Sequence, residues 1–245
     1  MGRVCIFCAK GKPTREHVIP AWLGDVLPGD GEFNFTRQQE DGSVNSWSTS
    51  ALNLTVKRVC GPCNHGWMSQ LESRAKPLLT PLIHGQAGTF GRHDQTLMAT
   101  WATKMAIVVE QTRSGRPMIP TEYRRHDYER QEPPPGTHVW MARYGGARTV
   151  WFDRFDGNLD SSQKRGRIHA VTLSLGQLVL QLYSLLIDKP EEIVIEKATP
   201  LPELWPNQLH RAVWPPPIHP LDDAQMQSLA KSLLIGQQDV AEHEA

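Results

Sequence analysis

Two pairs of cysteines near the start of the chain constrain its fold most strongly. All four cysteines of the 245-residue chain occur in C-x-x-C spacing, as Cys5 and Cys8 and as Cys60 and Cys63. Each pair can close a tight turn that presents two thiolates, and two such pairs supply the four sulfur ligands of a tetrahedral zinc site. We therefore expect a structural zinc ion that joins segments far apart in the sequence.

The cysteine pairs have two other interpretations, a disulfide framework and a thioredoxin-like redox centre. The N-terminal sequence lacks the apolar stretch of a secretory signal, and no window approaches the roughly 18 apolar residues of a membrane span. We therefore expect a cytoplasmic protein without membrane association, in which thiols stay reduced. A redox centre is the weaker alternative, because no βαβ pattern surrounds either pair.

The pattern of apolar residues predicts short strands and a helix around the cysteines. Strands are expected at 14–19, 32–39, 43–50 and 54–59, with one or two helical turns within 21–27 and a helix that begins at Asn64. The segments 32–39 and 43–50 flank Glu40-Asp41-Gly42, a sequence typical of a hairpin turn.

The second part of the chain predicts a separate unit of helices and strands. Glycines in the segment 85–94 indicate a linker, and a strong helical pattern follows it at 95–113. The segments THVWMARYGG and ARTVWFDRF are expected to pair around Gly145-Gly146, and a last helix is expected at 222–234. The fold class is therefore α+β, with a small antiparallel sheet in the second domain. The expected division is a zinc-containing domain at 1–84, the linker at 85–94, an α+β domain at 95–235 and a polar tail at 236–245.

The motifs around the cysteines resemble those of a known enzyme family. The first pair is followed by Glu16-His17 with Pro20 three residues on, and the second pair is followed at once by Asn64. This arrangement is similar to the HNH (His-Me finger, ββα-metal) endonucleases, in particular the zinc-containing endonuclease VII type. The resemblance covers residues 1–76. It implies an N-terminal ββα-metal domain with a structural zinc at the cysteines, an acid–His pair that ends a strand, and an Asn after the last cysteine.

The resemblance also implies a metal-dependent endonuclease, with double-stranded DNA as the expected substrate. His17 would be the general base that takes a proton from water, since imidazole titrates near neutral pH. Glu16 and Asn64 offer the oxygen ligands that Mg²⁺ or Mn²⁺ prefers. The zinc site, with four thiolates, is coordinatively full and would be structural. The chain departs from the family at Glu16, where the usual residue is Asp. Its third motif position is not clear, since His65 is too close to Asn64 to share its face and Glu72 lies eight residues after Asn64.

Each of these three residues also has a structural interpretation. His17 can be an ordinary polar residue of a strand, and Glu16 can be a surface partner of Arg15. Asn64 can be a helix N-cap, a position that Asn favours. The alternative function is therefore a zinc module whose HNH site has decayed and which binds nucleic acid or protein.

The charge distribution permits a polyanionic partner without requiring one. The chain has no net charge, but residues 1–92 and 93–170 each carry +3, and residues 171–245 carry −6. Basic side chains that can contact phosphates occur in two runs, Arg124 and Arg125, and Lys164, Arg165 and Arg167. Runs of this kind are also typical of a solvated surface.

Overall fold

The computed structural model describes residues 4–27, 33–38, 44–49, 54–112, 117–146, 148–160, 165–190, 193–196, 200–206, 208–229 and 234–237. Its helices are α1 (Leu23–Val26), α2 (Gly61–Cys63), the π-helical turn η1 (Asn64–Met68), α3 (Ser69–Ile83), α4 (Arg92–Glu110), α5 (Thr121–Arg130) and α6 (Asp223–Leu229). Its strands are β1 (Pro13–His17), β2 (Phe33–Gln38), β3 (Val44–Thr49), β4 (Thr55–Cys60), β5 (Gly88–Phe90), β6 (Thr137–Arg143), β7 (Val150–Asp160), β8 (Arg165–Leu175), β9 (Leu178–Ile187), β10 (Ile193–Glu196), β11 (Glu203–Trp205), β12 (Ala212–Trp214) and β13 (Leu234–Gln237).

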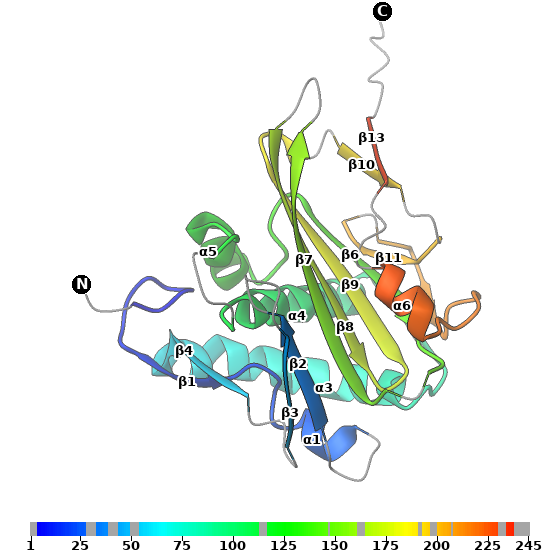
Figure 1. Cartoon of the computed structure of the whole chain (residues 1–245), viewed down its shortest axis with the longest axis horizontal. Helices are drawn as coiled ribbons and strands as arrows, with labels where there is room; N and C mark the ends of the chain where they lie inside the picture. Colours follow the sequence, from blue (N-terminus) through cyan, green and yellow to red (C-terminus); the bar gives the residue numbers. More distant parts are fainter. Residues whose placement is uncertain are drawn as a thin grey trace, which may run out of the picture.

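The N-terminal part consists of two antiparallel strands followed directly by a helix. β1 pairs with β4, and the chain passes from β4 through α2 and η1 into α3 (Figure 1). The hairpin β2–β3 and the helical turn α1 are inserted between the two paired strands. The predicted strands and helical turn of this part are therefore confirmed, and the order strand, strand, helix is the one that the resemblance implies.

A five-stranded antiparallel sheet, with the order β11-β6-β9-β8-β7, forms the second part. The sequence-based pairing of THVWMARYGG with ARTVWFDRF is wrong, because β9 and β8 lie between β6 and β7. The tight turn at Gly176, which has a φ of +53°, returns the chain from β8 directly into β9. Strand β9 is apolar and almost wholly buried, so it occupies the centre of the sheet, where both of its faces are covered.

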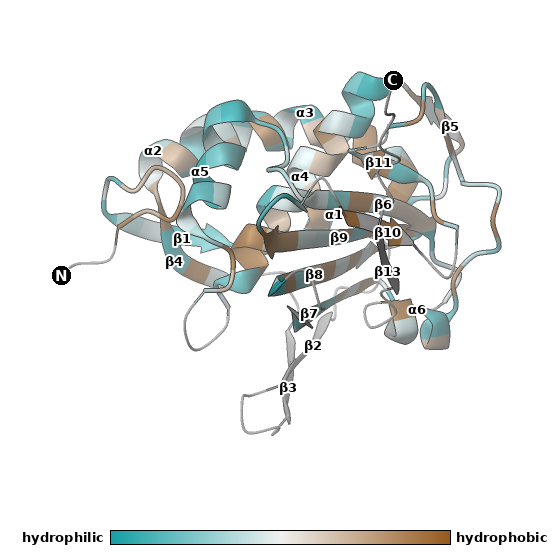
Figure 2. Cartoon of the chain, turned by 90° about the horizontal axis from the view of Figure 1, so that it is seen from above, coloured by the Kyte–Doolittle hydropathy of each residue, from teal (hydrophilic) through white to brown (hydrophobic). Residues whose placement is uncertain are grey.

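Helix α4 lies at the centre of the molecule, between α3 and one face of the sheet (Figure 1). Almost every residue from Gln95 to Glu110 is buried, which is the pattern of a helix enclosed on all sides. The opposite face of the sheet is covered by α6, whose Met226 and Leu229 pack with Trp140 and Tyr183. Hydrophobic residues accordingly concentrate on β8 and β9 between these layers (Figure 2). No helix in the described segments is both long and apolar enough to cross a bilayer.

One hydrophobic cluster connects the two predicted domains. It contains Phe7, Leu71 and Leu79 of the N-terminal part together with Trp101 of α4 and Leu182 of the sheet. The predicted linker at 85–94 contains β5, which pairs with β12, and the beginning of α4. The division at this segment stays a prediction, but the continuous core favours a single folding unit.

We expect the zinc-loaded full chain to unfold in one cooperative transition, and a fragment of residues 1–91 to be largely unfolded. The fragment lacks α4, so the buried faces of Leu71 and Leu79 would be exposed to water. Circular dichroism and amide dispersion in NMR spectra measure both outcomes. A fragment that binds zinc and gives the spectrum of a folded domain would instead establish the two-domain division.

Candidate zinc and nuclease site

The four cysteines come together as the sequence predicts. Their sulfur atoms all lie within 4.8 Å of one another, and Cys5, Cys60 and Cys63 are buried. The Sγ atoms of Cys8 and Cys60 are 3.6 Å apart. A tetrahedral zinc ion with bonds of about 2.3 Å places its sulfur ligands about 3.8 Å apart, so this cluster fits zinc.

The environment of the thiols also agrees with a metal site. Burial raises the pKa of the Cys60 and Cys63 thiols, and the neighbouring cysteines raise that of Cys63 further. The raised pKa values of Cys60 and Cys63 favour their protonated forms, so zinc binding would release protons from these two thiols and be coupled to folding. Among the described residues, these four form the only group of three or more His, Cys, Asp or Glu side chains close enough to share a metal ion.

Aromatic side chains fix the cysteine cluster to the rest of the molecule. The ring of Trp67 in η1 contacts Phe7 between the first cysteine pair, with ring centres 5.0 Å apart. The other side of Trp67 contacts Tyr128 of α5, with ring centres 5.9 Å apart. These ring contacts pack the turn of the first cysteine pair, η1 and α5 together, although α5 belongs to the second predicted domain.

Asn64 is not a helix N-cap. The helical conformation already begins at Gly61 after Cys60, and Asn64 has helical dihedral angles (φ −61°, ψ −55°). The helix is then kinked at Gly66 before α3 begins. The expectation that a helix begins at Asn64 is therefore wrong, because the proline at position 62 starts the helix earlier.

The side chain of Asn64 instead reaches across to strand β1. Its amide nitrogen lies 3.5 Å from the backbone carbonyl oxygen of Arg15, to which it donates a long hydrogen bond. Arg15 directly precedes Glu16 and His17. The cysteine cluster thus holds the residue that follows Cys63 against the strand that carries the predicted acid–His pair.

Glu16 and His17 face opposite sides of the β1–β4 ribbon. Glu16 is opposite Val56, which is buried, whereas His17 is opposite Thr55, and both His17 and Thr55 are exposed. Directly paired residues share a face of the sheet, so the Glu16 carboxylate turns toward the interior and the His17 imidazole toward solvent. The irregularity in the strand lies between Thr14 and Arg15 and does not bring the two side chains to one face.

Glu72, the residue considered for the third motif position, is part of a hydrogen-bonded cluster. The indole N–H groups of Trp22 and Trp101 donate to one carboxylate oxygen of Glu72, at 2.7 and 2.8 Å. The Lys104 ammonium forms an ion pair with the other oxygen, and its side chain is only 2% exposed. We call these four residues the Glu72 cluster. The sequence identified Glu72 but not its partners, because Lys104 lies on α4 in an apolar pattern.

The Glu72 cluster also affects Glu16. Burial raises the pKa of Glu16 to about 7, the negative charge of Glu72 raises it as well, and the Lys104 ammonium opposes both effects. No ion pair between Glu16 and Arg15 occurs among the described contacts, and the surface-partner interpretation of Glu16 stays untested. Glu16 is a half-buried carboxyl group whose ionisation the surrounding protein disfavours.

The two basic runs differ in their exposure. Arg124 is buried, and its guanidinium donates a hydrogen bond to the Thr121 hydroxyl, so it does not face a phosphate in solution. Arg125 is exposed and forms an ion pair with Glu129 at 2.6 Å. Arg165 and Arg167 are exposed on β8, and Lys164 lies outside the described residues. The phosphate-contact role stays a prediction for Arg125, Arg165 and Arg167.

No family model, curated protein or solved structure matches the chain. The interpretation of the site therefore depends on its own residues and on the motif resemblance.

We expect Cys60→Ser to lose bound zinc and to lower the unfolding midpoint by about 10 °C or more, because metal binding contributes directly to folding. Zinc content by atomic absorption and thermal unfolding by circular dichroism measure these changes. Cys60→His, which replaces one zinc ligand by another, is the matched control and should keep more of the metal. Full zinc content with unchanged unfolding in Cys60→Ser would contradict the assignment.

We expect Glu16→Gln to stabilise the zinc-containing fold, without added Mg²⁺ or Mn²⁺, at pH 8 but not at pH 4.5. Because the pKa of Glu16 is raised to about 7 in the folded state, folding favours its protonated form, and stability falls as pH rises from about 4.5 to about 7. The neutral amide avoids this loss, which we expect to be about 1–2 kcal/mol after allowing for solvent screening.

Urea unfolding at a series of pH values measures this difference. The exposed Glu129→Gln is a control for the loss of one negative charge and should change stability by less than about 0.5 kcal/mol at any pH. A Glu16→Gln effect that does not depend on pH would contradict the assigned environment of Glu16.

Proposed function

We propose that the protein is a metal-dependent endonuclease of the HNH type, which hydrolyses phosphodiester bonds in nucleic acid, with double-stranded DNA as the expected substrate. The observation that carries the proposal is the contact of Asn64 with the backbone of Arg15. It holds an amide side chain beside the Glu16-His17 pair, and the adjacent zinc site keeps it there. A helix cap would not require this contact.

In this proposal Glu16 and Asn64 hold a Mg²⁺ or Mn²⁺ ion through their side-chain oxygens. The amide nitrogen of Asn64 faces Arg15, which leaves the amide oxygen as the ligand atom. When bound, the cation neutralises charge on the phosphate and on the leaving oxygen. Two protein ligands suffice for Mg²⁺, which usually keeps several water molecules and binds substrate phosphates.

His17 acts as the general base in this proposal. It is the last residue of β1 and its imidazole is exposed to water. A general base removes a proton from the attacking water and need not contact the metal ion. The opposite orientations of Glu16 and His17 are therefore compatible with catalysis, provided that substrate and water lie at the end of the strand.

The proposal also explains why Glu16 is protected from solvent. A buried carboxyl group with a pKa near 7 is only partly ionised at neutral pH, and a divalent cation favours its ionised form. Glu72 is neutralised by Lys104, so it does not compete with Glu16 for the cation. Cation binding and rate should both increase between pH 6 and pH 8.

A second candidate function is a zinc module that binds nucleic acid or protein without catalysis. The separation of Glu16 and His17 on opposite faces of β1 favours this alternative. Both candidates share the structural zinc and the exposed basic residues Arg125, Arg165 and Arg167. Only cleavage distinguishes them.

We expect His17→Ala to lower the rate of plasmid nicking by about 10²–10⁴, the usual contribution of a general base. Its zinc content, unfolding and affinity for DNA should remain unchanged, since the imidazole is exposed and acts on water. Asn64→Asp should keep part of the activity, because it preserves an oxygen ligand, whereas Asn64→Ser should lose activity at any Mg²⁺ concentration tested.

A supercoiled plasmid incubated with Mg²⁺ or Mn²⁺ provides the assay, with EDTA and the His17→Ala protein from the same purification as controls for contaminating nucleases. Wild-type protein that cuts neither DNA nor RNA with either metal would reject the proposal. DNA binding that persists without cleavage would then support the zinc module.

A further inference from the structure

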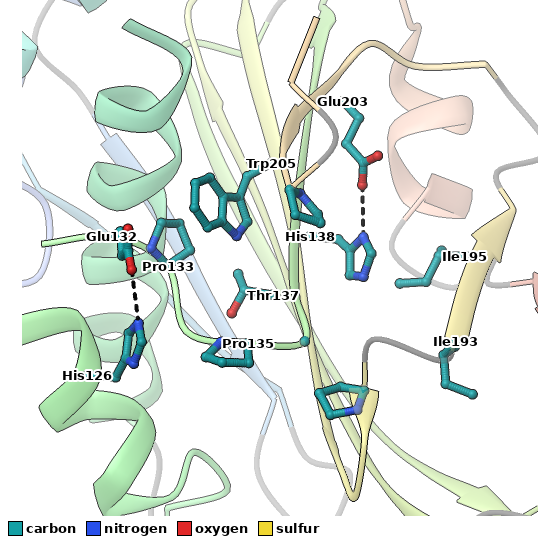
Figure 3. A pocket seen from close by; sticks show the side chains of 13 residues that line it. His126, Glu132, Pro133, Pro135, Thr137, His138, Ile193, Ile195, Glu203 and Trp205 are labelled. Atoms are coloured by element: carbon teal, nitrogen blue, oxygen red, sulfur yellow. Dashed lines mark hydrogen bonds and ion pairs between the residues drawn. The ribbon is translucent and has the colours of Figure 1, made fainter. Parts of the chain in front are cut away.

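A cleft of about 520 Å³ lies at one edge of the five-stranded sheet, apart from the cysteines and from Glu16 (Figure 3). Its volume is within the range of small-molecule sites. The residues that line it are His126, Glu132, Pro133, Pro135, Gly136, Thr137, His138, Pro190, Ile193, Ile195, Glu203, Trp205 and Pro206. They come from α5 and the segment that follows it, from β6, β10 and β11, and from the chain before β10 (Pro190) and after β11 (Pro206).

One His–Glu pair on the sheet is fixed in the wall of the cleft. The Nδ1 atom of His138 lies 2.8 Å from a carboxylate oxygen of Glu203, and the imidazole stacks on Trp140 with ring centres 5.5 Å apart. Because an ionised carboxylate only accepts hydrogen bonds, Nδ1 carries the proton in this contact. This contact and the stacking on Trp140 hold the imidazole in one orientation.

A second His–Glu pair lies at the other end of the cleft. The Nε2 atom of His126 is 3.7 Å from a carboxylate oxygen of Glu132, whose side chain is 46% exposed. Figure 3 shows this pair on one side of Trp205 and Thr137, with the His138–Glu203 pair on the other. The two ends of the cleft therefore each carry a carboxylate.

The chemistry of the lining selects the charge of the ligand. The lining residues that the structure describes include two glutamates, Glu132 and Glu203, and no lysine or arginine, and the two carboxylates favour a cationic ligand over an anion. The lining also contains apolar side chains, namely four prolines, Ile193 and Ile195, and the two isoleucines lie beyond the His138–Glu203 pair (Figure 3). The indole of Trp205 adds an aromatic surface, on which ammonium and guanidinium groups bind.

We propose that this cleft binds a small organic cation, with an ammonium or guanidinium group held by Glu203 or Glu132 and an aliphatic body against Trp205 and the prolines. The fixed acceptors at each end suit a ligand that carries hydrogen-bond donors. This site is independent of the proposed nuclease, since none of its residues belongs to the zinc site or to the Glu72 cluster.

Agmatine, which carries an amine and a guanidinium on a four-carbon chain, is the probe. We expect it to bind the full-length zinc-loaded protein with a dissociation constant in roughly the millimolar range, as is usual for so small a ligand. Isothermal titration calorimetry measures the affinity, and the imidazole resonances of His138 in NMR spectra should shift on binding. Glutarate, an anion of similar length, should not bind.

Two variants test the carboxylates. Glu203→Gln removes the charge but keeps an oxygen that can accept from His138, and it should weaken agmatine binding about tenfold. Glu132→Gln changes an exposed side chain that can be replaced without unfolding the protein, and it should also weaken binding. The matched control Glu129→Gln removes an exposed charge of α5 outside the cleft and should leave the affinity unchanged.

The cation can be a free amine or a basic side chain of a peptide, and a comparison of agmatine with N-acetyl-arginine N-methylamide distinguishes them. Tighter binding of the blocked amino acid indicates a peptide ligand, and tighter binding of agmatine indicates a free amine. The proposal is overturned by absence of saturable binding of either probe, by equal binding of glutarate, or by unchanged affinity in both carboxylate variants.

Discussion

The cluster of Cys5, Cys8, Cys60 and Cys63 is the constraint on which the N-terminal part of the structure depends. It joins the turn of Cys5 and Cys8, near the start of the chain, to the end of β4, more than fifty residues later. All four sulfur atoms lie within 4.8 Å of one another. Without a metal ion, four half-buried or buried thiols contribute little to stability, and the short β1–β4 pair is marginal alone. With a metal ion, the same cluster fixes Asn64 beside the strand that carries Glu16 and His17. The fold of the N-terminal part and the position of the proposed catalytic residues therefore both depend on the cysteine cluster.

The second constraint is the burial of a polar cluster between the two halves of the molecule. Glu72 on α3 and Lys104 on α4 form a buried ion pair, and two indole N–H groups satisfy the remaining capacity of the carboxylate. Such a pair adds little net stability compared with apolar residues, but it is costly to break and can specify one packing arrangement. It connects α3 to α4, and its two charges act on the pKa of Glu16. Lys104, in the second predicted domain, thereby influences Glu16, although the motif resemblance covers residues 1–76 alone.

Local patterns predicted much of the fold and of the zinc site, and long-range packing decided what they missed. The cysteine spacing predicts the cluster, and apolar periodicity predicts β1, β4 and α4 closely. The pairing of β6 with β7 was wrong because adjacency in sequence does not reveal that β8 and β9 fill the centre of the sheet. Helix α5 was not predicted, since its surface is polar and its position depends on the contact of Tyr128 with Trp67. The cleft with His138 and Glu203 could not be predicted either, because these residues are 65 positions apart and carry no motif.

The central claim is that the cysteine cluster positions a separate cation site made by Glu16 and Asn64. Crystals grown with Mn²⁺ and an uncleavable phosphorothioate duplex test it directly, through anomalous difference maps recorded at the zinc and manganese edges. The account predicts one zinc peak among the four cysteine sulfur atoms and one manganese peak in contact with oxygen atoms of Glu16, Asn64 and a phosphate. A manganese peak elsewhere on the protein, or no manganese peak with the duplex bound, would contradict it.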